Sequence, residues 1–235
     1  MLKVRWLVLV FTVVFLATLI AGIPASLVMS RVPSVPLAGA PLIVGPATGT
    51  IWNGAAPVTW RQQRARLDWR VDFHGLMPGV SWGLSGDLAL NGWAGARPGA
   101  VRLAVEQGRI PAGLIQHVSP FEAEGSLSIS DLRLAVSDHR LVEAGGELRY
   151  SGGQAGWQQG ETTLPELVAR IEPDPEGALV KVTDPTGTVM MEGRVQGNRG
   201  QVQVYRAWPA LLGVSRGGTP TDVVFESSQP LWNEE

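Results

Sequence analysis

The chain has 235 residues, a formal net charge of −2 and no cysteine. This length suffices for one medium-sized domain with a hydrophobic core. The near-neutral charge gives no electrostatic basis for binding nucleic acid. The lack of cysteine excludes disulfides, thiolate metal sites and cysteine nucleophiles. The 29 glycines and 17 prolines are typical of a turn-rich β protein or of flexible linkers.

An uncharged apolar run begins at residue 6 and continues to residue 30. Twelve residues between Leu7 and Ile23 are Leu, Ile, Val or Phe. They favour membrane insertion by about 4–7 kcal/mol in total, at roughly 0.3–0.6 kcal/mol each. Because about 20 apolar residues cross the hydrocarbon core, we expect an uncleaved signal anchor, a transmembrane helix, over residues 6–29.

Lys3 and Arg5 lie on the short side of this run. The positive-inside rule therefore predicts a cytoplasmic amino terminus, residues 1–5, and a periplasmic remainder in a bacterial inner membrane. A cleaved signal peptide is the alternative, since residues 38–40 (Ala-Gly-Ala) match a small-x-small cleavage site. That site lies far beyond the apolar run, which favours the anchor.

A proline-rich segment, residues 30–48, follows the expected anchor. Its four prolines predict an extended periplasmic stalk. From Gly49 onward, strand and turn signals predominate, so we expect one periplasmic β domain over residues 49–235.

The clearest strand signal runs from residue 65 to residue 73. Apolar side chains alternate there with charged ones: Ala65, Leu67, Trp69, Val71 and Phe73 against Arg66, Asp68, Arg70 and Asp72. A period of two over nine residues predicts a half-buried strand with one apolar and one solvated face. The arginines belong to the densest positive cluster of the chain. We interpret them as part of a charge-balanced solvated face, and contact with anionic lipid or a partner is the alternative.

Five of the nine tryptophans fall between residues 52 and 93. An indole buries a large apolar area, so we interpret these side chains mainly as core. An exposed aromatic surface for a partner is the alternative. Trp69 favours the core interpretation, because it shares the apolar side of its strand with Leu67 and Val71.

Further alternating runs are centred near residues 103, 128, 134, 181 and 203, with glycine-rich turn signals between them, including Gly145-Gly146. Short strands at this spacing predict a mainly β, predominantly antiparallel domain, built as a curved sheet or a sandwich. Short helices are expected at residues 110–118, 164–171 and 208–214.

Motifs that carry chemistry are weak. Residues 79–83 and 213–217 both match Gly-x-Ser-x-Gly, but the pattern around Ser81 continues as a strand, whereas a nucleophile elbow requires a following helix. The three histidines have no second histidine or cysteine at metal-ligand spacing. No phosphate-binding glycine loop occurs. We therefore expect no catalytic residue, no cofactor and no metal.

Several short motifs occur in a recognisable order. They are the run Gly49-Thr50-Ile51-Trp52-Asn53-Gly54, the pair Leu67 and Trp69, Trp82, the Gly-x-Leu-x-Leu run at 86–90, the strand 146–150 with Trp157 beyond it, Met191-Glu192-Gly193, and Pro-x-Leu-Leu at 209–212. In this order the chain resembles the type II secretion system protein N family (general secretion pathway protein N). Gly49, Thr50, Trp52, Gly54, Leu67 and Trp69 are the motif positions, and we expect their role to be structural.

The resemblance implies a non-enzymatic inner-membrane subunit of the type II secretion system, which exports folded proteins from the periplasm across the outer membrane. Its partners would be other secretion components: the inner-membrane platform, with pseudopilus or secretin-linking subunits as further candidates. The family also looks similar to AsmA-like envelope proteins. The alternative is therefore a lipid-binding or lipid-handling module whose apolar sheet face forms an open groove instead of a closed core.

Overall fold

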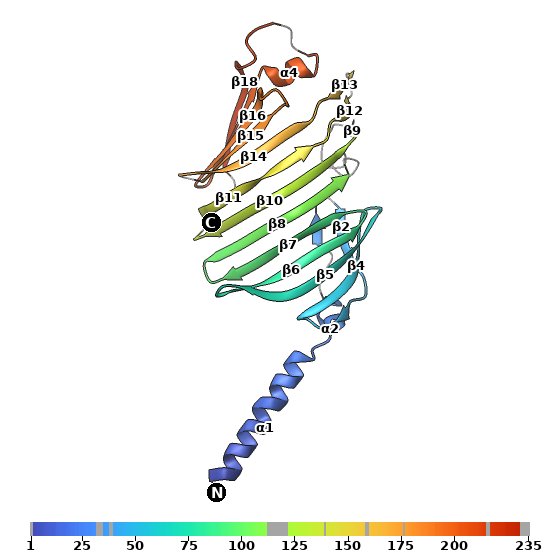
Figure 1. Cartoon of the computed structure of the whole chain (residues 1–235), viewed down its shortest axis with the longest axis vertical. Helices are drawn as coiled ribbons and strands as arrows, with labels where there is room; N and C mark the ends of the chain where they lie inside the picture. Colours follow the sequence, from blue (N-terminus) through green and yellow to red (C-terminus); the bar gives the residue numbers. More distant parts are fainter. Residues whose placement is uncertain are drawn as a thin grey trace.

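The computed structural model describes residues 2–31, 35–37, 40–111, 122–138, 140–157, 160–175, 177–214 and 217–230. Two helices, α1 (Leu2–Ala21) and α2 (Ala25–Met29), precede a long antiparallel sheet. A short helix, α4 (Ala207–Leu211), lies before the last strand. In Figure 1, α1 projects as a separate rod from one end of the sheet, and α4 lies at the opposite end.

The main sheet has the order β1-β2-β4-β5-β6-β7-β8-β10-β11-β14-β15-β16-β17-β18, with β3 also paired to β4. The strands are β1 (Val35–Leu37), β2 (Ala40–Val44), β3 (Thr48–Gly49), β4 (Asn53–Trp60), β5 (Gln63–His74), β6 (Met77–Gly86), β7 (Ala89–Arg97), β8 (Ala100–Pro111), β10 (Ser126–Ser137), β11 (Arg140–Tyr150), β14 (Leu167–Asp174), β15 (Gly177–Thr183), β16 (Val189–Gln196), β17 (Arg199–Tyr205) and β18 (Val223–Pro230). A smaller sheet contains β9 (Glu122–Ala123), β12 (Gly153–Trp157) and β13 (Gly160–Leu164).

Neighbouring strands of the main sheet follow one another closely in sequence, and every pair is antiparallel. Tight hairpin turns join most of them, as the glycine-rich turn signals predict. The prediction of a mainly β, antiparallel fold is therefore confirmed. The sheet twists along its length, so that β14–β18 are strongly turned relative to β8 and β10 (Figure 1). It is one extended sheet and not a sandwich.

Two local predictions are wrong. Residues 164–171 were expected as a helix, but they end β13 and begin β14. Leu167 and Ala169 lie opposite Tyr150 and Leu148 of β11, so burial on one side of the sheet overrides a weak helical pattern. Gly145-Gly146, expected as a turn, lies inside β11, where a bulge near Asp131 of β10 interrupts the register.

Of the other two expected helices, one is confirmed and one is not. Helix α4 confirms the helix expected at residues 208–214, although it begins at Ala207 and ends at Leu211. In the segment expected as a helix at residues 110–118, Ile110 and Pro111 belong to β8. Residues 112–118 lie outside the described part of the chain.

Part of the proline-rich segment joins the sheet. Strand β2 pairs with β4, and β1 pairs with β2. Residues expected to extend away from the domain therefore add two strands to one edge. Among the described residues, no helix meets the length and hydropathy requirements of a membrane span, and the anchor expected over residues 6–29 stays a prediction.

Indole rings lie across glycines of neighbouring strands. Trp69 of β5 is 7% exposed and covers its cross-strand partner Gly54. Trp82 of β6 covers Gly92 in the same way. On the opposite face, buried Trp93 covers two glycines of β6 and β7. Each ring needs a neighbour without a Cβ, which explains why tryptophan and glycine are both abundant in this part of the chain.

We predict that Gly54→Ala destabilises the fold by about 1–3 kcal/mol, the usual effect of overpacking a filled site. An added Cβ would lie 2.5 Å from Cζ2 of Trp69 and 2.5 Å from the carbonyl oxygen of Thr48. Urea unfolding followed by tryptophan fluorescence measures the change. Gly156→Ala in β12 is the matched control, because nothing lies within 4 Å of its Cβ position. Equal unfolding midpoints for the two variants would contradict the packing described.

Candidate functional site: the apolar face of the sheet

One face of the main sheet is apolar from β4 to β17. Residues that pair across antiparallel strands point to the same side, so the register assigns each side chain to a face. The resulting apolar face comprises Ala56, Leu67, Trp69, Val71, Val80, Trp82, Leu84, Leu90, Leu103, Val105, Ile129, Leu132, Leu134, Leu148, Ala169, Val180, Val182, Met191, Val202 and Val204. The period-two pattern predicted from residues 65–73 thus extends over nearly the whole domain.

Short helices cover only the two ends of this face. Near β4 and β5, Ala25 of α2 packs with Ala56 and Trp69. Near β14 and β16, Ala207 of α4 packs with Leu167 and Met190. Each cluster forms a small local core.

Between the two helices the apolar face is partly exposed: Val105 of β8 and Ile129 of β10 are buried, at 7% and 9% exposure. The exposed part lies toward the β7–β8 and β10–β11 turns. Val101 and Leu103 of β8 are 56% and 37% exposed, and Val136 of β10 is also exposed. A contiguous exposed apolar surface on a folded domain indicates a place where another molecule binds.

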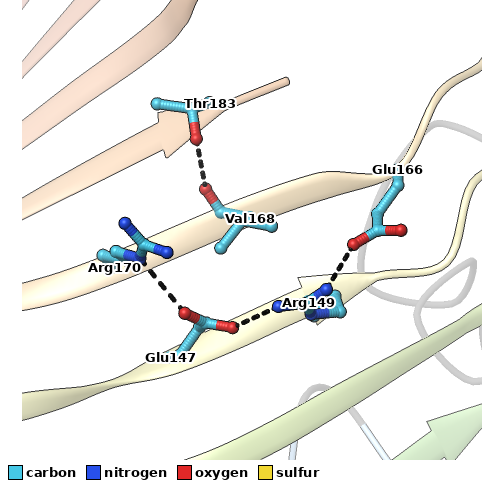
Figure 2. Close-up of polar contacts among 6 residues, drawn as sticks. All are labelled: Glu147, Arg149, Glu166, Val168, Arg170 and Thr183. Carbon is cyan, nitrogen blue, oxygen red and sulfur yellow. Dashed lines mark hydrogen bonds and ion pairs between the residues drawn. The ribbon is translucent and has the colours of Figure 1, made fainter. Parts of the chain in front are cut away.

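The opposite face is polar and carries ion pairs. Figure 2 shows Arg149 of β11 between two carboxylates: its guanidinium donates to Glu166 at 2.6 Å and to Glu147 at 2.8 Å. Arg170 of β14 donates to the second oxygen of Glu147 at 3.1 Å. These charges alternate in sign across the strands, which explains why this face can remain in water.

The polar face also has a hollow of about 800 Å³ over β7, β8 and β10. His74 stacks on Trp93 at its edge, with ring centroids 4.3 Å apart. Arg102, Glu106 and Glu143 line it, and Arg102 pairs with Glu143 at 3.6 Å. The described residues contain no group of three side chains that could hold a metal ion.

The predicted motif residues gather where the helices meet the sheet. Thr50 bridges to Pro24, and the Ile51 amide donates to the Ile23 carbonyl at 3.1 Å. The Trp52 indole donates to the carbonyl of Ile20, in the last turn of α1, at 2.8 Å.

The remaining motif residues stabilise the turn itself. Gly49 has a φ of +85°, which favours glycine. The Trp69 indole donates to the Ile51 carbonyl at 3.3 Å while its ring covers Gly54. Leu67 packs beside the cluster under α2. The motif thus connects α1 and the start of the sheet.

The weak hydrolase motif does not form an elbow at Ser81. This residue lies in the middle of β6, and its hydroxyl donates to Asp72 at 3.3 Å. The second motif's Ser215 lies outside the described residues, as do His117 and His139.

Sequence reasoning missed strand β18 (Val223–Pro230), which forms one edge of the sheet. The signal available was the run Val223-Val224-Phe225, a short β-branched and aromatic segment. The segment between β17 and β18 contains helix α4, so no short hairpin turn in the sequence marks this strand pair.

The fold defines an extended β scaffold with one apolar face and one charged face. The family model of the type II secretion system (T2SS), protein N, matches residues 40–210, and the chain belongs to this family. It is therefore a component of type II secretion, in a family not known for enzymes. Searches of curated proteins and of solved structures gave no match.

We predict that Glu147→Gln lowers stability at neutral pH by at most about 1 kcal/mol, because exposed and half-exposed ion pairs contribute little. The Glu147 side chain is 28% exposed. Hydrogen bonds from Arg149, and then from Arg170, hold the pKa of Glu147 below its ordinary value. A depressed pKa contributes stability above the unfolded-state value of about 4.3, and this contribution disappears as the pH falls through the folded-state value.

The difference in unfolding free energy between the parent chain and Glu147→Gln should therefore be largest above about pH 5 and shrink in more acidic buffer. Urea unfolding at a series of pH values measures it. A difference that grows on acidification would contradict the assigned ion pairs.

Proposed function

We propose that this chain is an inner-membrane subunit of the type II secretion system. Residues 6–29 anchor it, and the β domain acts in the periplasm through protein–protein contacts during export of folded proteins across the outer membrane. The observation that carries the proposal is the family match over residues 40–210. Family membership implies interaction with other secretion components, of which the inner-membrane platform and the pseudopilus or secretin-linking subunits are the candidates.

The anchor is supported by the character of the amino-terminal segment. Helix α1 is 20 residues long. Apolar side chains on all its sides are exposed, among them Phe11, Val14, Phe15 and Leu19. A helix that is apolar all round requires an apolar environment, either a protein core or a bilayer. The twelve large apolar residues between positions 7 and 23 favour the bilayer.

The two edges of the sheet differ, and this difference suggests where a partner binds. Strand β1 has only three residues, and its central residue, Pro36, has no amide hydrogen to donate. Strand β18 has eight residues, with Val223, Val224 and Phe225 exposed. Its outer backbone groups have no paired strand among the described residues. An open edge of this kind accepts an extended segment of another protein by strand addition.

Deletion of the gene tests the function directly. We expect the loss of secreted enzymes from the medium and their accumulation in the periplasm, and restoration by the full-length chain. A periplasm-specific reporter fused after Glu235 checks the topology and should be active. Unchanged secretion in the deletion strain would contradict the proposal.

Proline substitution at the open edge tests the mode of contact. Amides of successive strand residues point to opposite sides of the strand. Of the variants Ser227→Pro and Ser228→Pro, one therefore removes an amide that faces β17 (the inward change), and the other removes an amide that faces away from the sheet (the outward change). The inward change should lower the unfolding midpoint. The outward change should leave the midpoint nearly unchanged and reduce secretion. Full secretion with the stable variant would contradict strand addition at β18.

The exposed part of the apolar face favours one second candidate function, the binding of lipid. A sheet face with exposed Val101, Leu103 and Val136 can accept acyl chains as well as a protein. The deletion strain separates the two candidates. Altered outer-membrane permeability with normal secretion favours lipid handling, and lost secretion favours the secretion subunit.

A further inference from the structure

Exposed apolar side chains gather at the end of the sheet from which α1 projects. Two of them, Leu27 and Val28, belong to α2. The other two belong to the β5–β6 hairpin: Phe73 is 65% exposed and Leu76, at its tip, is 99% exposed. We call these four residues the collar. Strands β4, β5 and β6 are the strands nearest to α1, and α2 lies beside β4 (Figure 1).

Hydrogen bonds link β5, the strand that carries Phe73, to the end of α1. The Trp52 indole donates to Ile20 in the last turn of α1, and the Val71 amide donates to the Trp52 carbonyl at 2.7 Å. Phe73 follows Val71 by two residues on the same face of β5. The hairpin therefore extends from a point that is fixed to the carboxyl end of the helix.

The fold does not require leucine at the tip of this hairpin. His74 pairs with Met77, so Gly75 and Leu76 form a two-residue turn, with Gly75 at a φ of +64°. Such a turn needs glycine at the first position and accepts polar residues at the second. Leu76 buries almost no surface, and a polar side chain at this position would avoid the unfavourable free energy of exposing an apolar side chain to water.

Helix α2 also exposes apolar side chains that the fold does not bury. Ala25 is buried against the sheet at 1% exposure, whereas Leu27 and Val28 point away from it. The apolar residues of this end thus face outward, beside a helix that is itself apolar all round. Trp52, which is also exposed, and Arg31 supply an indole and a cation of the kinds that lie at headgroup level.

We infer that the collar rests on the surface of the lipid bilayer, where Phe73 and Leu76 insert beside the anchor. This inference rests on the proposed anchoring of residues 6–29. Its consequence is mechanical: a helix alone would leave the domain free to tilt, whereas a second contact formed by the hairpin fixes the orientation of the sheet relative to the membrane. The edge strand β18 would then be held at a defined direction for its partner.

The lack of cysteine permits a direct test with single-cysteine variants of the full chain. Leu76→Cys probes the collar and Val14→Cys probes the anchor. Thr221→Cys is the control, an exposed position in the turn that packs against α4 at the far end of the sheet. Each variant is labelled with an NBD fluorophore and reconstituted into phosphatidylethanolamine–phosphatidylglycerol vesicles that carry nitroxide groups at shallow or deep acyl positions.

We expect the probe at position 76 to be quenched several-fold more by shallow nitroxides than the probe at position 221, and the probe at position 14 to be quenched by deep ones. If position 14 is quenched while position 76 behaves as position 221 does, the collar inference is overturned and the anchor stands. If neither position is quenched, the anchor fails and the inference fails with it. Unfolding midpoints equal to that of the parent chain establish that each labelled variant is folded.

Discussion

Pairing between successive antiparallel strands is the constraint on which the rest of this structure depends. In a two-layer domain, the apolar faces of the layers bury each other. Here one sheet of fourteen strands in series dominates the fold, and a three-stranded sheet and the short helices α2 and α4 are small beside it. Its cohesion therefore comes from the backbone ladder and from side chains packed across neighbouring strands. The indole rings of Trp69 and Trp82, which cover Gly54 and Gly92, are two such cross-strand contacts on the apolar face.

The two faces and two edges of such a sheet must each be compatible with their surroundings. The polar face carries alternating charges, with Glu147 bonded to both Arg149 and Arg170. Helices α2 and α4 cover the ends of the apolar face, and between them Val101, Leu103 and Val136 remain exposed. Strand β1 is short and Pro36 removes one of its amide donors, whereas β18 is longer and has no paired strand on its outer side among the described residues. The surfaces that are left uncovered are those through which a secretion component can contact other molecules.

Much of this could be predicted from the sequence, because the strand pattern is local. The alternation from Ala65 to Phe73 gave the strand, its faces and the mainly β class. The short motifs from Gly49 to Trp69 pointed to the secretion family. The helix expected at 164–171 was wrong because pairing with β11, which depends on residues distant in sequence, decides that segment. The exposed part of the apolar face and the unpaired edge at β18 could not be predicted, since both depend on how distant segments pack.

The central claim is that this scaffold contacts other secretion components through its exposed β18 edge. Site-specific photo-cross-linking in secreting cells, with a benzophenone amino acid replacing Val224, tests it most directly. The account predicts a cross-linked product that contains another subunit of the type II secretion machinery, and no such product from a probe at Thr186, in the turn between β15 and β16. Cross-linking of position 224 to lipid alone, or equal labelling of both positions, would contradict it.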